Sequence, residues 1–403
     1  MHGDRIVIIG AGLAGLRAAE RLREREHLGP ITVIGDEPVR PYNRPPLSKQ
    51  VLAGRMQPEE LTLRAYDPRA ALDVHVDWVL GDGASTVNPK TRTVTLRSGR
   101  EIGYDGLVVA SGVEARTLPG APIHLPNVWT LRTLADCRAI DEAMTGADTV
   151  AIIGGGFIGC EVATAARQRA LHTTIVDVSS TLLGHAVGPA VGAIVTDIHR
   201  HAGVHLALGR TVDQYRTVGK HVELHLDDDT SLRADVVVIG VGTKPRVSFL
   251  DGLGLDLTDG IVCTPTCHVI GLTDTVAAGD CARWPNLRFD DQPRRVEHWI
   301  NAVEHARAAA DALLAGPTTA VPFAPIPRFW SEQHGVKIQS IGMPRLADTV
   351  HVTPTRAGHR AIATYHRHGR LIGVIAIDEP KQLLAYTSQL ANAVHDPALD
   401  AVA

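Results

Sequence analysis

The sequence predicts an α/β protein with two Rossmann-like dinucleotide-binding domains and a small α+β C-terminal domain. Three observations lead to this prediction. A glycine-rich motif at 10–15 stands between a short apolar run and a helix-forming run, and a second such motif stands at 154–159. After a Pro-rich stretch at 322–327, the rest of the chain mixes strand signals with one closing helix.

The first motif follows the apolar run 6–9, which we expect to be a buried strand. Its glycines are followed by a run rich in Ala, Leu, Arg and Glu to about residue 26, which favours a helix. A second β-branched run at 31–34 supplies the next strand. Together these segments are typical of the first half of a βαβ unit.

The second motif repeats this order one domain length later. A strand is expected at 149–153, a helix from about 160 to 170, and a strand at 173–176 that ends at Asp177. A carboxylate at that position can bond both ribose hydroxyls and repel a 2′-phosphate, so we expect NADH rather than NADPH. The alternative is that Asp177 is only a solvated strand end.

The remaining segments place further elements around these two units. Strands are expected at 91–96, 106–110, 235–240, 275–280 and 372–377, and helices at 297–314 and after Pro380. Asp280, at the end of one of these strands, can accept hydrogen bonds from a sugar-alcohol chain, or it can simply form a turn.

Composition limits the classes of function. A chain of 403 residues with 44% hydrophobic and 21% charged residues is long enough for two to four domains and is not typical of disorder. The net charge of −4 argues against bulk nucleic-acid binding, and no stretch approaches the ~20 apolar residues of a membrane helix. Five cysteines imply no disulfide framework, and with no secretory leader we expect a cytoplasmic protein.

Several further motifs point to one family. The segment at 40–49 reads RPYNRPPLSK, and GVEAR, LRT, GGGFIGCE, GD, EHW and FWSEQ follow in order along the chain. This pattern resembles the FAD-dependent, NADH-linked ferredoxin reductases of bacterial oxygenase systems. The resemblance covers nearly the whole chain, and it implies a glutathione reductase-type fold. It also implies an FAD-binding domain at 1–112 and 246–322, an NAD-binding domain at 113–245 and a C-terminal domain at 323–403.

The resemblance and the glycine motifs together assign a set of cofactor-binding residues. They are Gly10, Gly12, Leu13, Ala14, Gly15, Glu37, Arg44, Pro45, Lys49, Arg116, Arg132, Gly154, Gly156, Phe157, Ile158, Gly159, Asp177, Val241, Gly242, Gly279, Asp280, Glu297, His298, Trp299 and Trp330.

The resemblance implies that Lys49 and Glu161 are a catalytic pair beside the flavin ring. A lysine there favours reduced flavin, and a carboxylate orients and balances it. The alternative is that Lys49 caps a loop and Glu161 sits in the first turn of a helix. Trp299 and Trp330 either wall off the isoalloxazine ring or are ordinary core residues.

The positions of the cysteines distinguish this chain from disulfide reductases of the same fold. Disulfide reductases of this fold need a redox pair in the first domain, yet no cysteine precedes Cys137. We expect Cys137, Cys160, Cys263, Cys267 and Cys281 to be structural. No metal site is expected, because neither the cysteines nor the 20 histidines follow a metal-binding pattern. Electrons should then pass from NADH through FAD to an outside acceptor.

By the resemblance, that acceptor is an acidic [2Fe–2S] ferredoxin serving a monooxygenase or a Rieske-type oxygenase. A basic patch is expected from Arg44, Arg294, Arg295, Arg328 and Lys337, although each is equally well explained as a solvated charge. The alternatives are a reductase for rubredoxin or another small acceptor, and a slow-turnover redox sensor that binds FAD and NADH. We expect a monomer or weak homodimer.

Two positions depart from the family. Glu114 and His185 stand where arginines are common in the family. These departures bear on the expected affinity for NADH and not on the expected fold.

Overall fold

A parallel sheet of five strands surrounds the first glycine motif in the computed structural model, which describes residues 3–63, 75–123, 125, 127–355 and 358–392. Its strands, in the order β19-β7-β1-β2-β3, are β1 (Ile6–Ile9), β2 (Ile31–Gly35), β3 (Asp77–Leu80), β7 (Gly106–Val109) and β19 (Thr275–Ala277). Every neighbouring pair is parallel. The apolar run of β1 is buried on both faces, as expected for a central strand of such a sheet.

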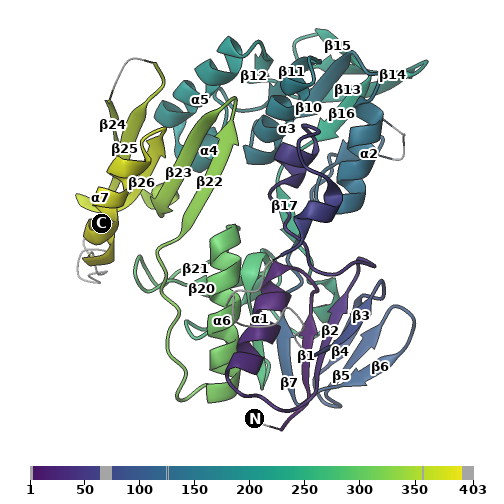
Figure 1. The fold of residues 1–403 in the computed structure, drawn as a ribbon, viewed down its shortest axis with the longest axis vertical. Helices are drawn as coiled ribbons and strands as arrows, with labels where there is room; N and C mark the ends of the chain where they lie inside the picture. Colours follow the sequence, from purple (N-terminus) through teal and green to yellow (C-terminus); the bar gives the residue numbers. More distant parts are fainter. Residues whose placement is uncertain (1–2, 64–74, 124, 126, 356–357, 393–403) are drawn as a thin grey trace.

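Two helices cover one face of this sheet, α1 (Leu13–Glu24) and α6 (Trp299–Ala315). They lie side by side although nearly 300 residues separate them (Figure 1), and their small residues, such as Ala18 and Ala306, share one core with the strands. The chain therefore returns to the first sheet after its middle part, because both β19 and α6 belong to this layer.

A second parallel sheet surrounds the second glycine motif. Its strands, in the order β12-β11-β10-β16-β9, are β9 (Val128–Thr130), β10 (Thr149–Ile153), β11 (His172–Asp177), β12 (His205–Leu208) and β16 (Val236–Ile239). The helices of this part are α2 (Leu134–Met144), α3 (Phe157–Gln168), α4 (Gly184–Val187) and α5 (Pro189–His201). The pairing of β10 with β11 and β16 is parallel, which confirms the second predicted βαβ unit.

Small sheets lie around these two layers. They are β4 (Ala84–Asn88), β5 (Thr93–Leu96) and β6 (Glu101–Gly103); β13 (Val212–Val218), β14 (His221–Leu226) and β15 (Ser231–Ala234); β18 (Ile261–Val262), β20 (Ala282–Pro285) and β21 (Pro293–Arg294); and the ribbon of β8 (Val113–Ala115) and β17 (Thr243–Pro245). That ribbon is antiparallel, and the chain passes through it both on entering and on leaving the middle part.

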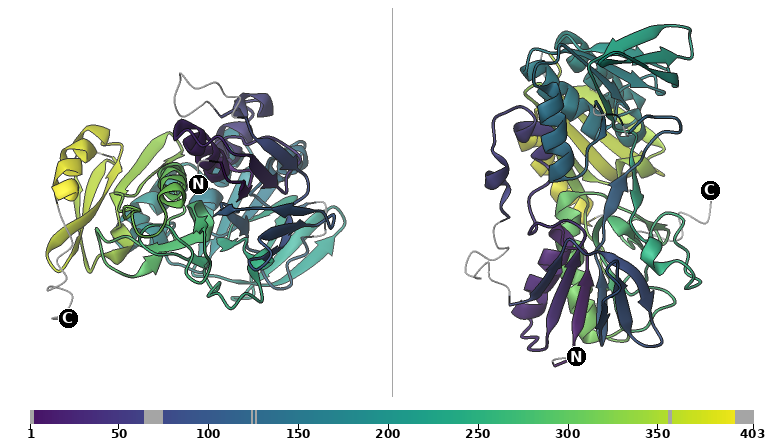
Figure 2. Two further views of the ribbon diagram at one scale, coloured as in Figure 1. Left: turned by 90° about the horizontal axis from the view of Figure 1, so that it is seen from below. Right: turned by 90° about the vertical axis from the view of Figure 1, so that its right-hand side faces the viewer.

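The C-terminal part is an antiparallel sheet covered by one helix, α7 (Pro380–Asn392). Its strands, in the order β22-β23-β26-β25-β24, are β22 (Arg328–Gln333), β23 (Val336–Gly342), β24 (Thr349–Pro354), β25 (Ala361–Arg367) and β26 (Arg370–Ile377). Figures 1 and 2 show this sheet on one side of the molecule and the three-stranded sheet β13–β15 on the opposite side.

The α/β fold class is thus confirmed, and the predicted strands and helices all appear within a few residues of their expected bounds. The bounds of the three domains stay a prediction, and the ends of the first and last domains, at 1–2 and 393–403, lie outside the described residues. Within the described part of the chain, no helix is both long and apolar enough to cross a membrane.

Candidate active site

A cavity of about 1330 Å³ opens at the carboxyl ends of β1 and β2, where ligands bind in open parallel sheets. Both glycine turns contribute to its wall, through Gly10 and Gly12 on one side and Gly156 on the other. Lys49 and Trp330 also line it, so all three parts of the chain meet at one space. A volume of this size is large enough for more than one small ligand.

The first glycine turn has the geometry of a pyrophosphate site. Gly10 has φ +123°, and a Cβ there would lie 2.1 Å from the Ala110 carbonyl oxygen. A Cβ on Gly15 would lie 1.8 Å from the Gly10 carbonyl oxygen, whereas one on Gly12 would meet nothing within 4 Å. No side chain caps the start of α1, so its first N–H groups are available to an anion. This turn therefore fits a dinucleotide.

The second turn repeats the same pattern. A Cβ on Gly159 would lie 1.9 Å from the Gly154 carbonyl oxygen, while the space around Gly156 is open. Asp177 ends β11, and its carboxylate accepts hydrogen bonds from the Gly155 N–H at 2.5 Å and the Ser179 N–H at 2.6 Å. The carboxylate thus closes the loop behind the turn, and its contact with a ribose stays a prediction.

Lys49 and Glu161 form an ion pair at the centre of the cavity wall. Lys49 Nζ lies 2.8 Å from Glu161 Oε2, and their side chains are 13% and 3% exposed. Lys49 comes from a one-turn π-helix (Leu47–Val51), a geometry frequent at functional sites, and Glu161 comes from the first part of α3. The pairing itself is therefore as expected, and its role beside a flavin stays a prediction. Glu161 does not lie in the first turn of α3, whereas Lys49 Nζ also lies 3.4 Å from the Pro45 carbonyl oxygen, as a residue that caps a loop would.

Two serines hold the same carboxylate. Ser48 Oγ donates to Glu161 Oε2 at 2.5 Å, and Ser331 Oγ donates to Glu161 Oε1 at 2.6 Å. A buried carboxylate needs such donors, because each buried oxygen without a hydrogen-bond donor lowers the free energy of unfolding. The motifs PPLSK and FWSEQ contain both serines, but their roles were not apparent from the sequence.

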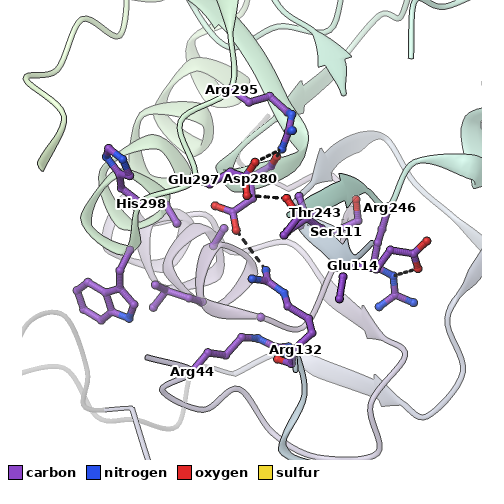
Figure 3. A pocket seen from close by; sticks show the side chains of 18 of the residues that line it. Arg44, Ser111, Glu114, Arg132, Thr243, Arg246, Asp280, Arg295, Glu297 and His298 are labelled. Atoms are coloured by element: carbon purple, nitrogen blue, oxygen red, sulfur yellow. Dashed lines mark hydrogen bonds and ion pairs between the residues drawn. The ribbon is translucent and has the colours of Figure 1, made fainter. Parts of the chain in front are cut away.

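Asp280 also lines the cavity, beside Arg132. Arg132 Nη2 donates to Asp280 Oδ2 at 3.2 Å, and Figure 3 shows Arg132 reaching toward Asp280 while Arg295, Glu297 and Thr243 form a second linked group. Burial raises the pKa of Asp280, and the Arg132 guanidinium opposes that shift. Asp280 lines the cavity and can serve as an acceptor for a ligand hydroxyl.

At the other end of the cavity, carboxylates alternate with arginines. Glu37 accepts from Arg44 at 2.5 Å and from the Tyr42 hydroxyl at 2.7 Å. Asp36 forms an ion pair with Arg246. Sequence reasoning named Glu37 and missed Asp36 and Arg246, although the adjacent acidic pair in the sequence was a signal for the first of them.

Aromatic rings complete the wall. The rings of Trp299 and Trp330 lie 6.1 Å apart, and Trp299 Nε1 donates to Asn43 Oδ1 at 3.0 Å. Trp330 is 44% exposed, so it is not an ordinary core residue. His298 also lines the cavity; burial lowers its pKa to about 4, and its Nδ1 has no hydrogen-bond partner among the described residues. An unmet buried ring nitrogen at a cavity wall fits a site built to hold a polar ligand.

Most of the predicted cofactor-binding residues lie in this wall. The five that do not line the cavity are Gly15, Gly154, Gly159, Gly279 and Asp177. The glycines among them allow close packing or tight turns behind the wall, as the contacts of Gly15 and Gly159 show.

Three of the five members of the predicted basic patch form ion pairs within the protein, and the patch itself stays a prediction. Arg44 pairs with Glu37, Arg294 with Asp290, and Arg295 with both Asp259 and Glu297. The Arg295 side chain is only 9% exposed, so its charge is used inside the protein.

Arg328 and Lys337 remain exposed. Of the two departures from the family, Glu114 forms an ion pair with Lys244 at 2.9 Å, and His185 is exposed.

The five cysteines are all buried and unpaired. None lines the cavity, and burial raises the pKa of Cys137 to about 12 and that of Cys160 well above its usual range. Such thiols are poor nucleophiles, because the thiolate is the reactive form. In the described residues, no group of three or more His, Cys, Asp or Glu could hold a metal ion.

Comparison with known proteins agrees with this site. The family model "Pyridine nucleotide-disulphide oxidoreductase" matches residues 4–306, and "Reductase C-terminal" matches residues 328–402. Putidaredoxin reductase CamA from Pseudomonas putida is 33% identical over 94% of this chain and 89% of its own length.

A second relative is the biphenyl dioxygenase system ferredoxin–NAD(+) reductase component from Paraburkholderia xenovorans, which is 36% identical over 84% of this chain and 81% of its own length. The crystal structure of the covalent putidaredoxin reductase–putidaredoxin complex matches with a TM-score of 0.89 and 32% identity, over 98% of this chain and 95% of the matched one. The chain therefore belongs to the pyridine nucleotide-disulphide oxidoreductase family, as a relative of the ferredoxin reductase components of dioxygenase systems that carries a Reductase C-terminal domain.

Proposed function

We propose that this protein is an NADH-dependent FAD enzyme that passes single electrons to a [2Fe–2S] ferredoxin serving a monooxygenase or a Rieske-type oxygenase. The observation that carries the proposal is the single cavity into which two glycine turns open, with the Lys49–Glu161 pair in its wall. Relatives named as ferredoxin reductase components support the choice of acceptor.

Bound FAD supplies the hydride acceptance and the one-electron release that side chains cannot provide. The residues of this chain bind and orient it. The open turn at Gly12 and the uncapped start of α1 would hold the pyrophosphate, and Asp280 would accept from the ribityl hydroxyls. Lys49 would place a positive charge beside the ring, held there by Glu161.

The cysteines favour transfer to a partner protein over disulfide chemistry. All five thiols lie outside the cavity wall and are buried, so this chain offers no relay between a flavin and a small disulfide. Electrons would then leave directly from the site, where the exposed Trp330 and the neighbouring Trp299 stand at the rim.

We further propose a cytoplasmic protein that is a monomer or weak homodimer and binds no nucleic acid. Unpaired buried cysteines fit a reducing compartment, and the net charge of −4 fits no polyanion. An acidic partner would need basic groups at the surface, for which Arg328 and Lys337 are the exposed candidates.

The test is a reductase assay on purified protein with its absorption spectrum. We expect a yellow FAD spectrum, bleaching by NADH faster than by NADPH, and cytochrome c reduction that depends on an added [2Fe–2S] ferredoxin. Reduction of a disulfide without ferredoxin would overturn the proposal. Equal stimulation by rubredoxin would favour the small-acceptor alternative, and a long-lived complex with NADH in place of turnover would favour a sensor.

A further inference from the structure

A chain of buried hydrogen bonds leads from Glu161 away from the cavity. Ser331 Oγ lies 2.6 Å from Glu161 Oε1, and Gln333 Nε2 lies 3.1 Å from Ser331 Oγ. Gln333 Oε1 lies 3.0 Å from His199 Nε2, and His199 Nδ1 lies 3.1 Å from His334 Nε2. We call Ser331, Gln333, His199 and His334 the positioning chain, and nothing in the proposed reaction uses the last three.

The direction of every bond in this chain follows from its first member. The Glu161 carboxylate can only accept, so the Ser331 hydroxyl donates to it and accepts from the Gln333 amide. The Gln333 carbonyl then faces His199, whose Nε2 must carry the hydrogen. A neutral His199, whose pKa burial lowers to about 4, accepts at Nδ1 from His334. All four donors therefore point toward Glu161.

Three of these four residues are completely enclosed, and His334 is partly buried. The exposed fractions are 1% for Ser331, 0% for Gln333 and 0% for His199. Ser331 and Gln333 alternate on the inward face of β22, a place where apolar residues are usual, and His199 comes from α5. Burying polar side chains costs free energy unless they are bonded, so a chain of this length calls for a role.

Gln333 excludes one obvious role. An amide does not readily take up one proton and release another, so the chain is not a path for protons between Glu161 and His334. What the chain can transmit is orientation. Glu161 Oε2 faces Lys49 at 2.8 Å and Ser48 at 2.5 Å, and Ser331 is the donor that fixes the opposite oxygen.

We propose that His199, Gln333 and Ser331 are positioning residues that keep Glu161 turned toward Lys49. The proposal rests on the proposed function, because the Lys49–Glu161 pair acts beside FAD there. Without the Nε2–H of His199, the Gln333 amide is free to flip, so that its oxygen and nitrogen exchange places. Its carbonyl would then face Ser331 and compete with Glu161 for the hydroxyl hydrogen.

The test uses three variants of the FAD-loaded enzyme. His199→Leu removes the donor, and His199→Gln restores an N–H where Nε2 stood. His201→Leu is the matched control, because His201 is exposed at the end of the same helix, where it forms a hydrogen bond with the Asp197 carbonyl oxygen and a ring contact with His359. The readouts are the midpoint potential of bound FAD, measured by dithionite titration without NADH, and the rate of FAD reduction by NADH.

We expect His199→Leu to lower the potential, because Lys49 is held less firmly beside the reduced ring, and to slow reduction by NADH about tenfold. His199→Gln should return both values toward those of the unmodified enzyme, and His201→Leu should change neither. Ser331→Ala is a smaller change and should lower the potential and slow the reduction in the same way. It takes the place of His199→Leu in the test if His199→Leu folds poorly.

A double-mutant cycle separates positioning from general loss of structure. In the Glu161→Gln background the effect of His199→Leu on the potential should disappear, whereas an equal effect in both backgrounds overturns the proposal. No effect of either His199→Leu or Ser331→Ala also overturns it. If NADH fails to reduce the unmodified enzyme, the proposed function is wrong. The double-mutant cycle still tests the positioning proposal, because the midpoint potential of bound FAD is measured by dithionite titration without NADH.

Discussion

Glu161 is the residue on which the site converges. Its carboxylate is 3% exposed and accepts from an ammonium and two hydroxyls that belong to two separate segments of the chain, the π-helix Leu47–Val51 and the strand β22. An isolated carboxylate at that depth would be costly, and removing any one donor leaves part of that cost uncompensated. The residue therefore couples the chemistry of the site to the packing around it.

Replacing Lys49 tests this coupling directly. We expect Lys49→Met to slow FAD reduction by NADH about a hundredfold, because the positive charge beside the ring is lost. The free energy of unfolding should fall by about 2 kcal/mol, since Glu161 keeps only its serine donors. Stopped-flow absorbance and urea unfolding measure the two effects. Lys337→Met, at an exposed site, is the control, and an unchanged reduction rate in Lys49→Met would remove Lys49 from the mechanism.

The coenzyme preference is a second property that single residues set. Asp177 ends β11, and Val178 beside it is 63% exposed. We expect Asp177→Ala with Val178→Arg to change the ratio of kcat/KM for NADPH over NADH by about a hundredfold, because a like-charge contact costing several kcal/mol is replaced by attraction. Val178→Arg alone should change it far less. An unmodified enzyme that already prefers NADPH would contradict the role of Asp177.

For single residues, the sequence predicts which side chains belong to the site better than it predicts which residues they contact. Lys49 and Glu161 were predictable because each stands in a distinctive motif. The pairing of Arg295 with Asp259 was not, because Asp259 is 36 positions away and only its second partner, Glu297, is local. His199 carried no signal either, since a histidine near the end of an amphipathic helix usually faces solvent.

Among the elements, the two strand–turn–helix units have the most stringent geometry. In each, a Cβ on the third glycine would lie 1.8 or 1.9 Å from the carbonyl oxygen of the first, whereas a Cβ on the middle glycine would meet nothing closer than 3.9 Å. The two roles predict different losses when each glycine is replaced by alanine. Replacing the third glycine should mainly lower the stability of the fold, whereas replacing the middle glycine should mainly weaken the binding of the ligand.

We expect Gly15→Ala to lower the free energy of unfolding by about 3 kcal/mol, because its Cβ would lie 1.8 Å from a backbone oxygen. Gly12→Ala should cost less than about 1 kcal/mol yet weaken FAD binding about tenfold, because the new methyl group occupies the approach of the pyrophosphate. Urea unfolding of the apoprotein and FAD titration separate the two. Equal loss of stability in both variants would show that the turn has a single role.

The elements that the sequence revealed are those with strong apolar periodicity. The strand β1 matches its apolar run residue for residue, and β10 begins one residue before its own run, because the residues of both runs are buried. The three-stranded sheet β13–β15 was not predicted, and five of the seven residues of β13 are exposed. Its pairing with β14 rather than its own pattern makes it a strand.

For the whole molecule, the cavity depends on three parts that are separate in sequence. The π-helix Leu47–Val51, which follows β2 in the chain, supplies Lys49, the part around the second sheet supplies Glu161 through α3, and the C-terminal sheet supplies Ser331 through β22. The sequence motifs indicated which residues share a ligand, but only the fold shows that hydrogen bonds join all three parts. Titration of buried groups should therefore affect the stability of the molecule as a unit.

Two fully buried histidines make that stability depend on pH. Burial lowers the pKa of His199 to about 4 and that of His305 to about 3, below the ordinary value of 6.5. Between these values the unfolded chain binds protons that the folded chain does not, so stability falls as the pH drops below about 6.5. At pH 5.5 each residue should cost about 1 kcal/mol relative to pH 8.

Urea unfolding between pH 5 and 8 measures this loss, in a range where carboxylates contribute little. His305→Gln keeps a polar group near the Gly279 N–H, which lies 3.3 Å from His305 Nδ1, but it cannot titrate. We expect this variant to be less stable at pH 8 and yet to lose less stability on acidification, by about 1 kcal/mol at pH 5.5. His201→Gln, at an exposed site, should keep the original pH dependence. An unchanged pH dependence in His305→Gln would mean that His305 is protonated in the folded protein, and that the neutral ring stacked on Phe323 is not its native form.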